Sequence, residues 1–394
     1  MNYQQRDFLV DHIRSILAFY DGRVIDTSGG FFQNFKDDGS VFDAGRRHLV
    51  SSCRMVFNYC KAYELFGDTV YRDHARHGID YLRRRHWSTS RNGYHWTLTD
   101  GHVADDQTNH CYGLAFVMLC SAAAHEIGIE GARDDIMRVH GLMEQHLWDP
   151  SIEIYADEAT PDWSAVTPYR GQNANMHSCE ALIAAFEATG ETAFLDRACG
   201  LARVITVDQA SKSNGLIWEH FTSELDIDWD YNRDDPKNLY RPWGFQPGHQ
   251  TEWSKLLLTL HSHRPESWLV ERAVELFDRA IELCWDEKNG GIFYGFAPDG
   301  TICDTDKYFW VQAESFAAAA RLLKQTGIER YADWYEKIWQ YAWDHMIDHQ
   351  HGAWYRVLTA SNRKYSDEKS VAGGKCDYHT IGACWDVIRI TDAA

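Results

Sequence analysis

A short motif recurs along nearly the whole chain at intervals of about sixty residues. It consists of a glycine, or Glu153 in one copy, followed by an alternating aromatic run such as GGFFQNF, NGYHWTL or GGIFYGF. Because glycine before alternating apolar residues is typical of a turn and a short strand, each copy predicts a brief β element. A repeat of this length constrains the fold more than any other feature of the sequence. The six copies begin at Gly30, Gly93, Glu153, Gly215, Gly291 and Gly352.

A second sequence pattern, used below as a second marker of the repeat, recurs at the same spacing. Its copies lie between those of the first motif. Segments of helical periodicity end at Gly67, Gly128, Gly190 and Gly327, and the following segment opens with an acidic residue. Glycine readily adopts the left-handed conformation that ends a helix, and an acid suits the positive end of the next one. Each repeat is therefore predicted to contain a helix, a glycine turn, a second helix and a short β element.

Six helical hairpins can form an open solenoid or close into a ring. The Ala-rich segment ESFAAAARLL, residues 314–323, suits a crowded inner ring. We therefore predict an all-α fold, an (α/α)6 barrel of six helical hairpins with short β elements at one end. No Pro-, Gly- or Ser-rich linker divides the sequence, so residues 1–394 are predicted to form a single domain.

The net charge of −19 comes from 58 acidic residues against 39 Lys and Arg, without basic blocks. This balance argues against nucleic acid and membrane surfaces as partners. The N-terminus mixes charges into an amphipathic pattern, and no apolar run reaches the length of about 18 residues that a membrane helix needs, so we expect a cytoplasmic protein. Ten scattered cysteines without a CxxC pair indicate free thiols. The oligomeric state is left open, a homo-oligomer included.

One polar residue lies near the start of each predicted inner helix. A single histidine or arginine at such a position is usually a cap or a solvated group, but the shared register favours a functional site. If the barrel closes, these side chains meet at one of its mouths, and the rings of Trp243, Trp253 and Trp310 are placed to line a sugar pocket if they face inward. The six residues are Arg54, Tyr112, His177, His249, Glu314 and His379.

Two histidines precede an acid by three residues, in HSCE (His177, Glu180) and HQTE (His249, Glu252). This spacing places each pair on one face of a helix, but too few carboxylates and no HExxH or Cys/His cluster accompany it. We therefore predict no metal and no other cofactor, and expect each acid to orient its histidine. Paired histidines suit reversible proton transfer at a carbon next to a carbonyl, as at C2 of an open-chain aldose. Arg54 or a protonated histidine could stabilise the enediolate.

Several segments resemble the N-acylglucosamine 2-epimerase superfamily, and the resemblance covers nearly the whole chain. They are HLVSSCRMVFNY, YRGQNANMHSCEA, DDPKNLYRPWGFQPGHQTEW, FWVQAES and KCDYHT. GQNANMH and PGHQTEW are similar to the bacterial aldose–ketose isomerase branch, which includes mannose and sulfoquinovose isomerases. The resemblance implies the (α/α)6 fold and a metal-free isomerase of D-mannose and D-fructose, which could extend to D-lyxose.

The resemblance also implies roles for individual residues. His249 and His379 would be the acid/base pair working through a cis-enediol, with His249 preferred for proton transfer at C2. The residues that would bind or polarise the sugar are Arg54, Tyr112, Asn173, His177, Glu252, Trp310 and Glu314.

Other functions remain alternatives. A sugar 2-epimerase of the cellobiose or N-acylglucosamine type differs only in where the proton returns, and KCDYH is close to the cellobiose 2-epimerase segment. Sulfoquinovose enzymes carry Gln where this chain has Lys375. A glycoside hydrolase or lyase would need two flanking carboxylates, whereas the aligned positions are mainly histidines. A carbohydrate-binding repeat scaffold is the non-enzymatic alternative. The acidic and aromatic insert 222–246 is either a lid or a surface excursion.

Overall fold

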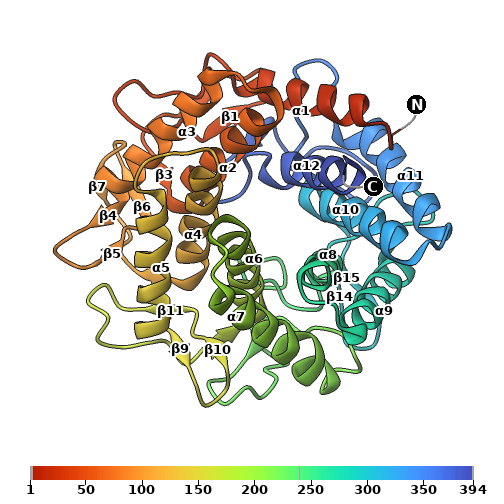
Figure 1. Ribbon diagram of the computed structural model, residues 1–394. Helices are drawn as coiled ribbons and strands as arrows, with labels where there is room; N and C mark the ends of the chain where they lie inside the picture. The colour runs from red at the N-terminus through yellow and green to blue at the C-terminus, as the bar shows by residue number, and fades with distance from the viewer. Residues whose placement is uncertain (1–2, 239, 393–394) are drawn as a thin grey trace. The chain divides into compact units, whose positions relative to one another are not determined.

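Helices dominate the structure, and strands of two or three residues lie between the hairpins (Figure 1). The computed structural model describes residues 3–238 and 240–392. These residues fall into two compact units. One unit, called unit A, contains Leu17–Leu201 and Glu368–Tyr378; the other, unit B, contains the chain up to Ile16, Ala202–Asp367 and the residues from His379 onward. The prediction of a helical fold with short β elements is confirmed.

Unit A contains three long helices that lie side by side, each followed by a second helix (Figure 1). α4 packs between α2 and α6, while α3 packs on α2 and α5 packs on α4. Every residue of α4 from Cys111 to Ala124 is buried except Tyr112, because its sequence has no polar face. No described helix is long and apolar enough to cross a membrane. The helices are α2 (Leu49–Phe66), α3 (Thr69–Tyr81), α4 (Cys111–Glu126), α5 (Ala132–His146), α6 (Gln172–Thr189) and α7 (Thr192–Arg203).

The strands of unit A are antiparallel. Two three-stranded sheets have the orders β18-β1-β2 and β3-β6-β7, and the pairs are β4-β5, β8-β11 and β9-β10. The motif copies at Gly93 and Glu153 supply β5 and β10, as their patterns predict. The strands are β1 (Asn34–Lys36), β2 (Val41–Asp43), β3 (Arg47–His48), β4 (Trp87–Ser88), β5 (Gly93–Tyr94), β6 (Thr97–Thr99), β7 (Val103–Ala104), β8 (Asn109–His110), β9 (Trp148–Asp149), β10 (Ile154–Tyr155), β11 (Glu158–Ala159), β12 (Arg170–Gly171) and β18 (Glu368–Ser370).

Unit B repeats the same local arrangement. α8 packs beside α10, α9 packs on α8, and α11 packs on α10. A buried ion pair between Arg321 and Asp386 joins α10 to α12, and Phe8 of α1 packs edge-on against Trp339 of α11. The helices are α1 (Arg6–Tyr20), α8 (Pro247–His263), α9 (Ser267–Cys284), α10 (Phe309–Thr326), α11 (Arg330–Tyr341) and α12 (Tyr378–Asp392), and the strands are β13 (His220–Phe221), β14 (Gly295–Phe296), β15 (Ile302–Asp304), β16 (Lys307–Tyr308) and β17 (Val357–Leu358).

The glycine markers end helices as predicted. Gly67, Gly190 and Gly327 follow α2, α6 and α10 with φ values of 69°, 75° and 66°, and each backbone N–H binds a carbonyl in the last helical turn. This is the left-handed cap that glycine adopts without steric cost. After Gly67, the Asp68 carboxylate accepts a hydrogen bond from the Val70 N–H and starts α3.

On each of three long helices, one amide side chain forms two hydrogen bonds with a single backbone residue of the preceding β motif. The amide oxygen accepts from the backbone N–H, and the amide nitrogen donates to the backbone carbonyl. Asn175 of α6 accepts from Tyr155 N and donates to Tyr155 O at 2.8 and 3.1 Å. Gln250 of α8 does the same with Ile217, and Gln312 of α10 with Ile292. These amides tie each β motif to the long helix that follows it in the chain. They also lie within two residues of His177, His249 and Glu314, so they fix the helix starts that carry the predicted site.

The cysteine prediction is confirmed, since all ten cysteines are free. Eight of them are buried. Burial raises the pKa of thiols such as Cys111, to about 12, and this opposes reactive thiolate chemistry.

Candidate active site

The predicted polar residues lie in the first two turns of the long helices. Within unit A, Arg54 comes from α2, Tyr112 from α4 and His177 from α6; within unit B, His249 comes from α8, Glu314 from α10 and His379 from α12. The residues of each unit lie close to one another.

In unit B, His249 is held by a carboxylate from a different element. Its Nδ1 lies 2.9 Å from each carboxylate oxygen of Glu219, which is buried just before β13. Because an ionised carboxylate can only accept, the proton of a neutral His249 ring lies on Nδ1, and Nε2 keeps its lone pair. The three-residue spacing in HQTE predicted that Glu252, one turn further along α8, orients His249. That assignment is wrong, since the acid at Nδ1 is Glu219.

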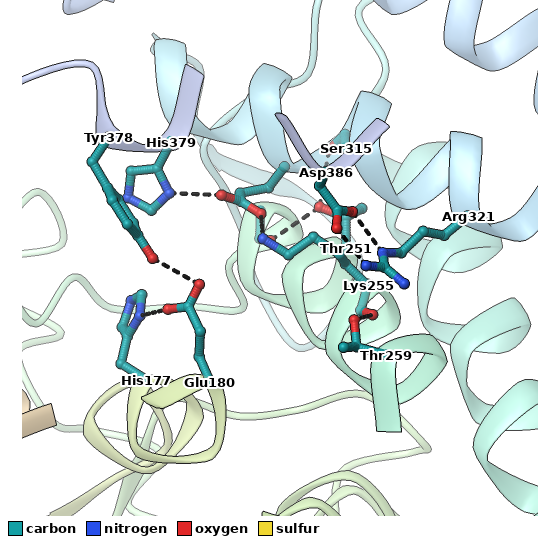
Figure 2. Close-up of polar contacts among 12 residues, drawn as sticks. His177, Glu180, Thr251, Lys255, Thr259, Ser315, Arg321, Tyr378, His379 and Asp386 are labelled. Carbon is teal, nitrogen blue, oxygen red and sulfur yellow. Dashed lines mark hydrogen bonds and ion pairs between the residues drawn. The ribbon is translucent and has the colours of Figure 1, made fainter. Parts of the chain in front are cut away.

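His379 has an equivalent partner in Glu314. The His379 Nδ1 donates to Glu314 Oε1 at 2.7 Å, and the second oxygen of Glu314 accepts from the ammonium of Lys255 (Figure 2). Glu314 and His379 are buried, and Lys255 is nearly so. Both histidines therefore have Nδ1 bound to a carboxylate, which makes Nε2 the ring nitrogen that would exchange a proton with a substrate. Glu314, predicted to bind sugar, is placed here as the partner of His379.

Trp310 lies between the two histidine rings within unit B. Its ring centroid is 5.0 Å from that of His249 and 5.8 Å from that of His379. Gly248, directly before His249, is required here because a Cβ would lie 2.5 Å from the Trp310 ring. Of the three tryptophans suggested for the pocket, Trp310 contacts both histidines. Trp253 is instead completely buried, and Trp243 packs edge-on against Trp218.

Glu252 lies in the same cluster, although it is not the carboxylate at His249 Nδ1. One oxygen of Glu252, one of Glu314 and a ring nitrogen of His379 lie within 4.8 Å of one another. Such a group could hold a divalent cation. Glu314 already accepts hydrogen bonds from His379 and Lys255, however, so its lone pairs are partly used. Activity without metal stays a prediction.

In unit A, Arg54, Tyr112 and His177 form a contiguous cluster. The Arg54 guanidinium donates to the Tyr112 hydroxyl at 2.9 Å, and the Tyr112 and His177 rings meet edge to face at 5.0 Å. The guanidinium also lies over the Phe116 and Tyr378 rings, at 4.4 and 5.1 Å from their centroids. These cation–π contacts hold a buried positive charge that remains suitable for binding oxygen atoms.

A third carboxylate orients His177. Its Nδ1 lies 2.9 Å from Glu180 Oε2, and Tyr378 donates its hydroxyl to the other oxygen at 2.7 Å (Figure 2). The orienting role predicted from the three-residue spacing in HSCE is confirmed. Tyr378 is the first residue of α12.

Asn173 has the most direct sign of a ligand contact. It lies at the second position of α6, one turn before His177. Its side-chain oxygen is buried and has no hydrogen-bond partner among the described residues. Since a buried polar atom without a partner is costly, this oxygen is available to accept from a bound hydroxyl group.

The insert 222–246, in which residue 239 lies outside the described residues, makes contacts both within itself and with other residues of unit B. Asn232 donates to Arg241 O and the Trp243 indole donates to Trp229 O, both at 2.7 Å. Lys237 pairs with Asp304 and Asp306 at 3.1 and 2.9 Å. These contacts describe a folded excursion within unit B, and its action as a lid stays open.

Sequence reasoning missed Glu219 and Lys255. The repeat did contain a signal for Glu219, which lies four residues after Gly215, just as Asp157 lies four residues after Glu153. Asp157 accepts from the backbone N–H of Gly171 next to α6, whereas Glu219 contacts the side chain of His249 on α8. For Lys255 the sequence carried no comparable signal.

Comparison with known proteins identifies the family of the chain. The chain is 54% identical to the D-mannose isomerase of Marinomonas mediterranea over 98% of both chains. A crystal structure of D-mannose isomerase superposes with a TM-score of 0.97 at 53% identity, covering 99% of each chain. The cellobiose 2-epimerase of Bacteroides fragilis is more distant, at 21% identity over 95% of each chain. The profile of the N-acylglucosamine 2-epimerase (GlcNAc 2-epimerase) family matches residues 30–383, and the chain belongs to this family.

Proposed function

We propose that the protein is an aldose–ketose isomerase that interconverts D-mannose and D-fructose by proton transfer through a cis-enediol. The observation that carries the proposal is the pair of histidines in unit B. Each has Nδ1 bound to a buried carboxylate and a ring tilted against that of Trp310. The likeness to D-mannose isomerases over nearly the full chain supports this sugar.

The chemistry uses the Nε2 atoms, because Nδ1 of each histidine is bound to a carboxylate. His249 removes the proton at C2 of the open-chain aldose while His379 protonates O1, which gives the enediol. His249 then returns its proton to C1 and His379 removes the proton from O2, which gives the ketose. No atom is gained or lost, and each histidine ends in its starting protonation state. Trp310 offers an apolar surface to a sugar C–H face.

We further propose that the two units close into one (α/α)6 barrel, so that residues 1–394 act as a single catalytic domain. Arg54, Tyr112, Asn173 and His177 would then bind the same sugar as His249 and His379. Arg54 would stabilise the developing enediolate charge. The equal helix–turn–helix pattern in both units supports this arrangement, and a crystal structure with bound sugar tests it. We also expect a cytoplasmic location. The oligomeric state, a homo-oligomer included, stays open.

Two related activities compete with mannose isomerisation. Return of the proton to the opposite face of C2 would make the protein a 2-epimerase. A sulfoquinovose isomerase would need to bind a sulfonate, and Lys375 is a poor candidate because it is buried and paired with Asp377. Burial lowers the pKa of Lys375 below its usual value, although Asp377 opposes that shift.

The test is incubation of EDTA-dialysed protein with D-mannose in D2O, followed by NMR of the products. We expect fructose with deuterium at C1. Glucose labelled at C2 would identify an epimerase. Absence of turnover of mannose, lyxose and sulfoquinovose, with sugar binding retained, would support the carbohydrate-binding scaffold. Dependence on added divalent metal would refute the metal-free mechanism and point to Glu252, Glu314 and His379 as ligands.

A further inference from the structure

Lys255 does not belong to the predicted polar ring, yet it contacts the carboxylate that holds His379. It lies on α8 six residues after His249 and donates its ammonium to Glu314 (Figure 2). We propose that Lys255 is a positioning residue that keeps Glu314 ionised and limits how strongly Glu314 stabilises the protonated form of His379. The inference rests on the proposed role of His379 in isomerisation.

The charges in this part of unit B alternate. Glu314 contacts Lys255, and Asp386 contacts Arg321 through Nε at 2.6 Å and through a second, shorter bond. Burial alone would raise the pKa of Asp386, but Arg321, Arg389 and Lys255 lower it below its ordinary value. Lys255 therefore lies close enough to influence both acids. The charges of Glu314, Lys255, Asp386 and Arg321 cancel without any charge on His379.

This balance matters because His379 must both donate and accept a proton. A buried carboxylate beside a histidine favours the imidazolium, since nothing else nearby compensates the negative charge. If the carboxylate stabilised the imidazolium form of His379 too strongly, the ring would release its proton too slowly. A lysine on the far oxygen of Glu314 offsets that charge and lets His379 exist in both forms near neutrality.

The other charged groups around His379 are few among the described residues of unit B. α8 contributes Glu252 and Lys255, α10 contributes Glu314 and Arg321, and α12 itself contributes Asp386. Glu252 adds negative charge near His379, which increases the need for a cation. Lys255 is the lysine that meets this need through a direct contact with Glu314.

A purely structural role for Lys255 is the competing explanation, and the chain contains a matched comparison. Lys61 of α2 in unit A is also buried and pairs with two acids, Glu64 and Glu126, both at 2.9 Å. Its side chain is 6% exposed, against 12% for Lys255. Lys61→Met should therefore destabilise the fold to a similar degree as Lys255→Met, without any effect on His379.

The experiment follows the ring nitrogens of His379 by NMR in protein labelled with 15N-histidine, and His379→Asn assigns the signal. In Lys255→Met we expect the midpoint pH of the His379 titration to rise by about one unit. The reason is that the positive charge on the other side of the Glu314 carboxylate is lost. In Glu314→Gln we expect the midpoint to fall. Lys255→Arg should titrate as the native protein does, and so should Lys61→Met.

Kinetics give a second readout. In Lys255→Met, kcat for mannose should fall by about tenfold or more at neutral pH with KM nearly unchanged, and the pH profile of kcat/KM should shift in the same direction as the ring titration. Lys255→Arg should restore most of the activity. Should Lys255→Met fail to fold, the fall in midpoint for Glu314→Gln and the unchanged midpoint for Lys255→Arg carry the test.

The proposal is overturned if the His379 midpoint is the same in Lys255→Met and the native protein, or if Lys61→Met shifts it equally. The NMR titration needs no substrate, so it separates this inference from the proposed function. Titration shifts of the expected sign in a protein that converts no sugar would leave the role of Lys255 intact and refute the isomerase assignment instead.

Discussion

The Nδ1 atom of His249 lies 2.9 Å from both oxygens of Glu219, a residue thirty positions earlier on a different element. This contact fixes the ring orientation, so Nε2 is the nitrogen that we propose acts on the substrate. Glu219→Gln removes the charge that stabilises a protonated His249. We expect kcat to fall by about tenfold to a hundredfold with KM within about threefold, measured by steady-state kinetics with mannose. Glu224→Gln, at an exposed acid nearby, is the control, and an equal loss there would contradict the assignment.

His379→Asn should abolish turnover while mannose still binds. The asparagine can keep a hydrogen bond to Glu314 but cannot exchange a proton near neutrality. We expect kcat to fall by a factor of about 100 or more, and the mannose dissociation constant from calorimetry to change by less than about threefold. Substantial residual turnover would show that another group transfers the proton.

Glu180 connects His177 to Tyr378, so the two contacts should act together. Glu180→Gln and Tyr378→Phe should each lower kcat/KM, by about 1–2 kcal/mol in transition-state free energy for a charged hydrogen bond. The double variant should lose less than the sum of the single losses. Additive losses in this double-mutant cycle would indicate that Tyr378 acts independently of Glu180.

The buried pair Lys375 and Asp377 should be important for stability. Asp377 has a φ of 54°, an unusual value for a residue other than glycine, directly before α12, and Tyr20 donates to its carboxylate at 2.6 Å. Lys375→Met leaves this buried carboxylate without its cation and should cost about 3–5 kcal/mol of unfolding free energy. Chemical denaturation measures the change, with the exposed Lys288→Met as a control expected to be nearly neutral.

His86 should make the fold sensitive to mild acid. Burial, the largest cause, lowers the pKa of His86 from 6.5 to about 4, and its Nδ1 lies 2.9 Å from His95 O. Between these values the unfolded chain binds a proton that the folded chain does not, so stability is full above about pH 6.5 and falls towards pH 4. The free energy of unfolding that is lost through His86 is at most about 3 kcal/mol.

The measurement for this prediction is the free energy of unfolding as a function of pH. In His86→Gln the decline between pH 6.5 and 4 should be smaller than in the native protein. The exposed His102→Gln variant should keep the native slope. An unchanged slope in His86→Gln would assign the acid sensitivity to other groups.

The sequence predicted the hairpin repeat and the register of its polar residues because both depend on local properties. Glycine at a left-handed cap, as at Gly67 and Gly190, and apolar residues at helical spacing act within a few residues of themselves. The same holds for Glu180, which shares a helix face with His177 because three residues separate them.

The partners of the two proposed catalytic histidines were decided by the tertiary structure. Glu219 precedes β13, whereas His249 lies on α8; Lys255 lies on α8, whereas Glu314 lies on α10. Contacts of this kind depend on how the elements pack and on the rotation of each helix about its axis, and no spacing along the chain encodes either quantity. The sequence by itself determined that histidines and acids would gather at the helix starts. The packing of those helices determined which acid binds which histidine, because a hydrogen bond needs atoms placed to within a few tenths of an ångström.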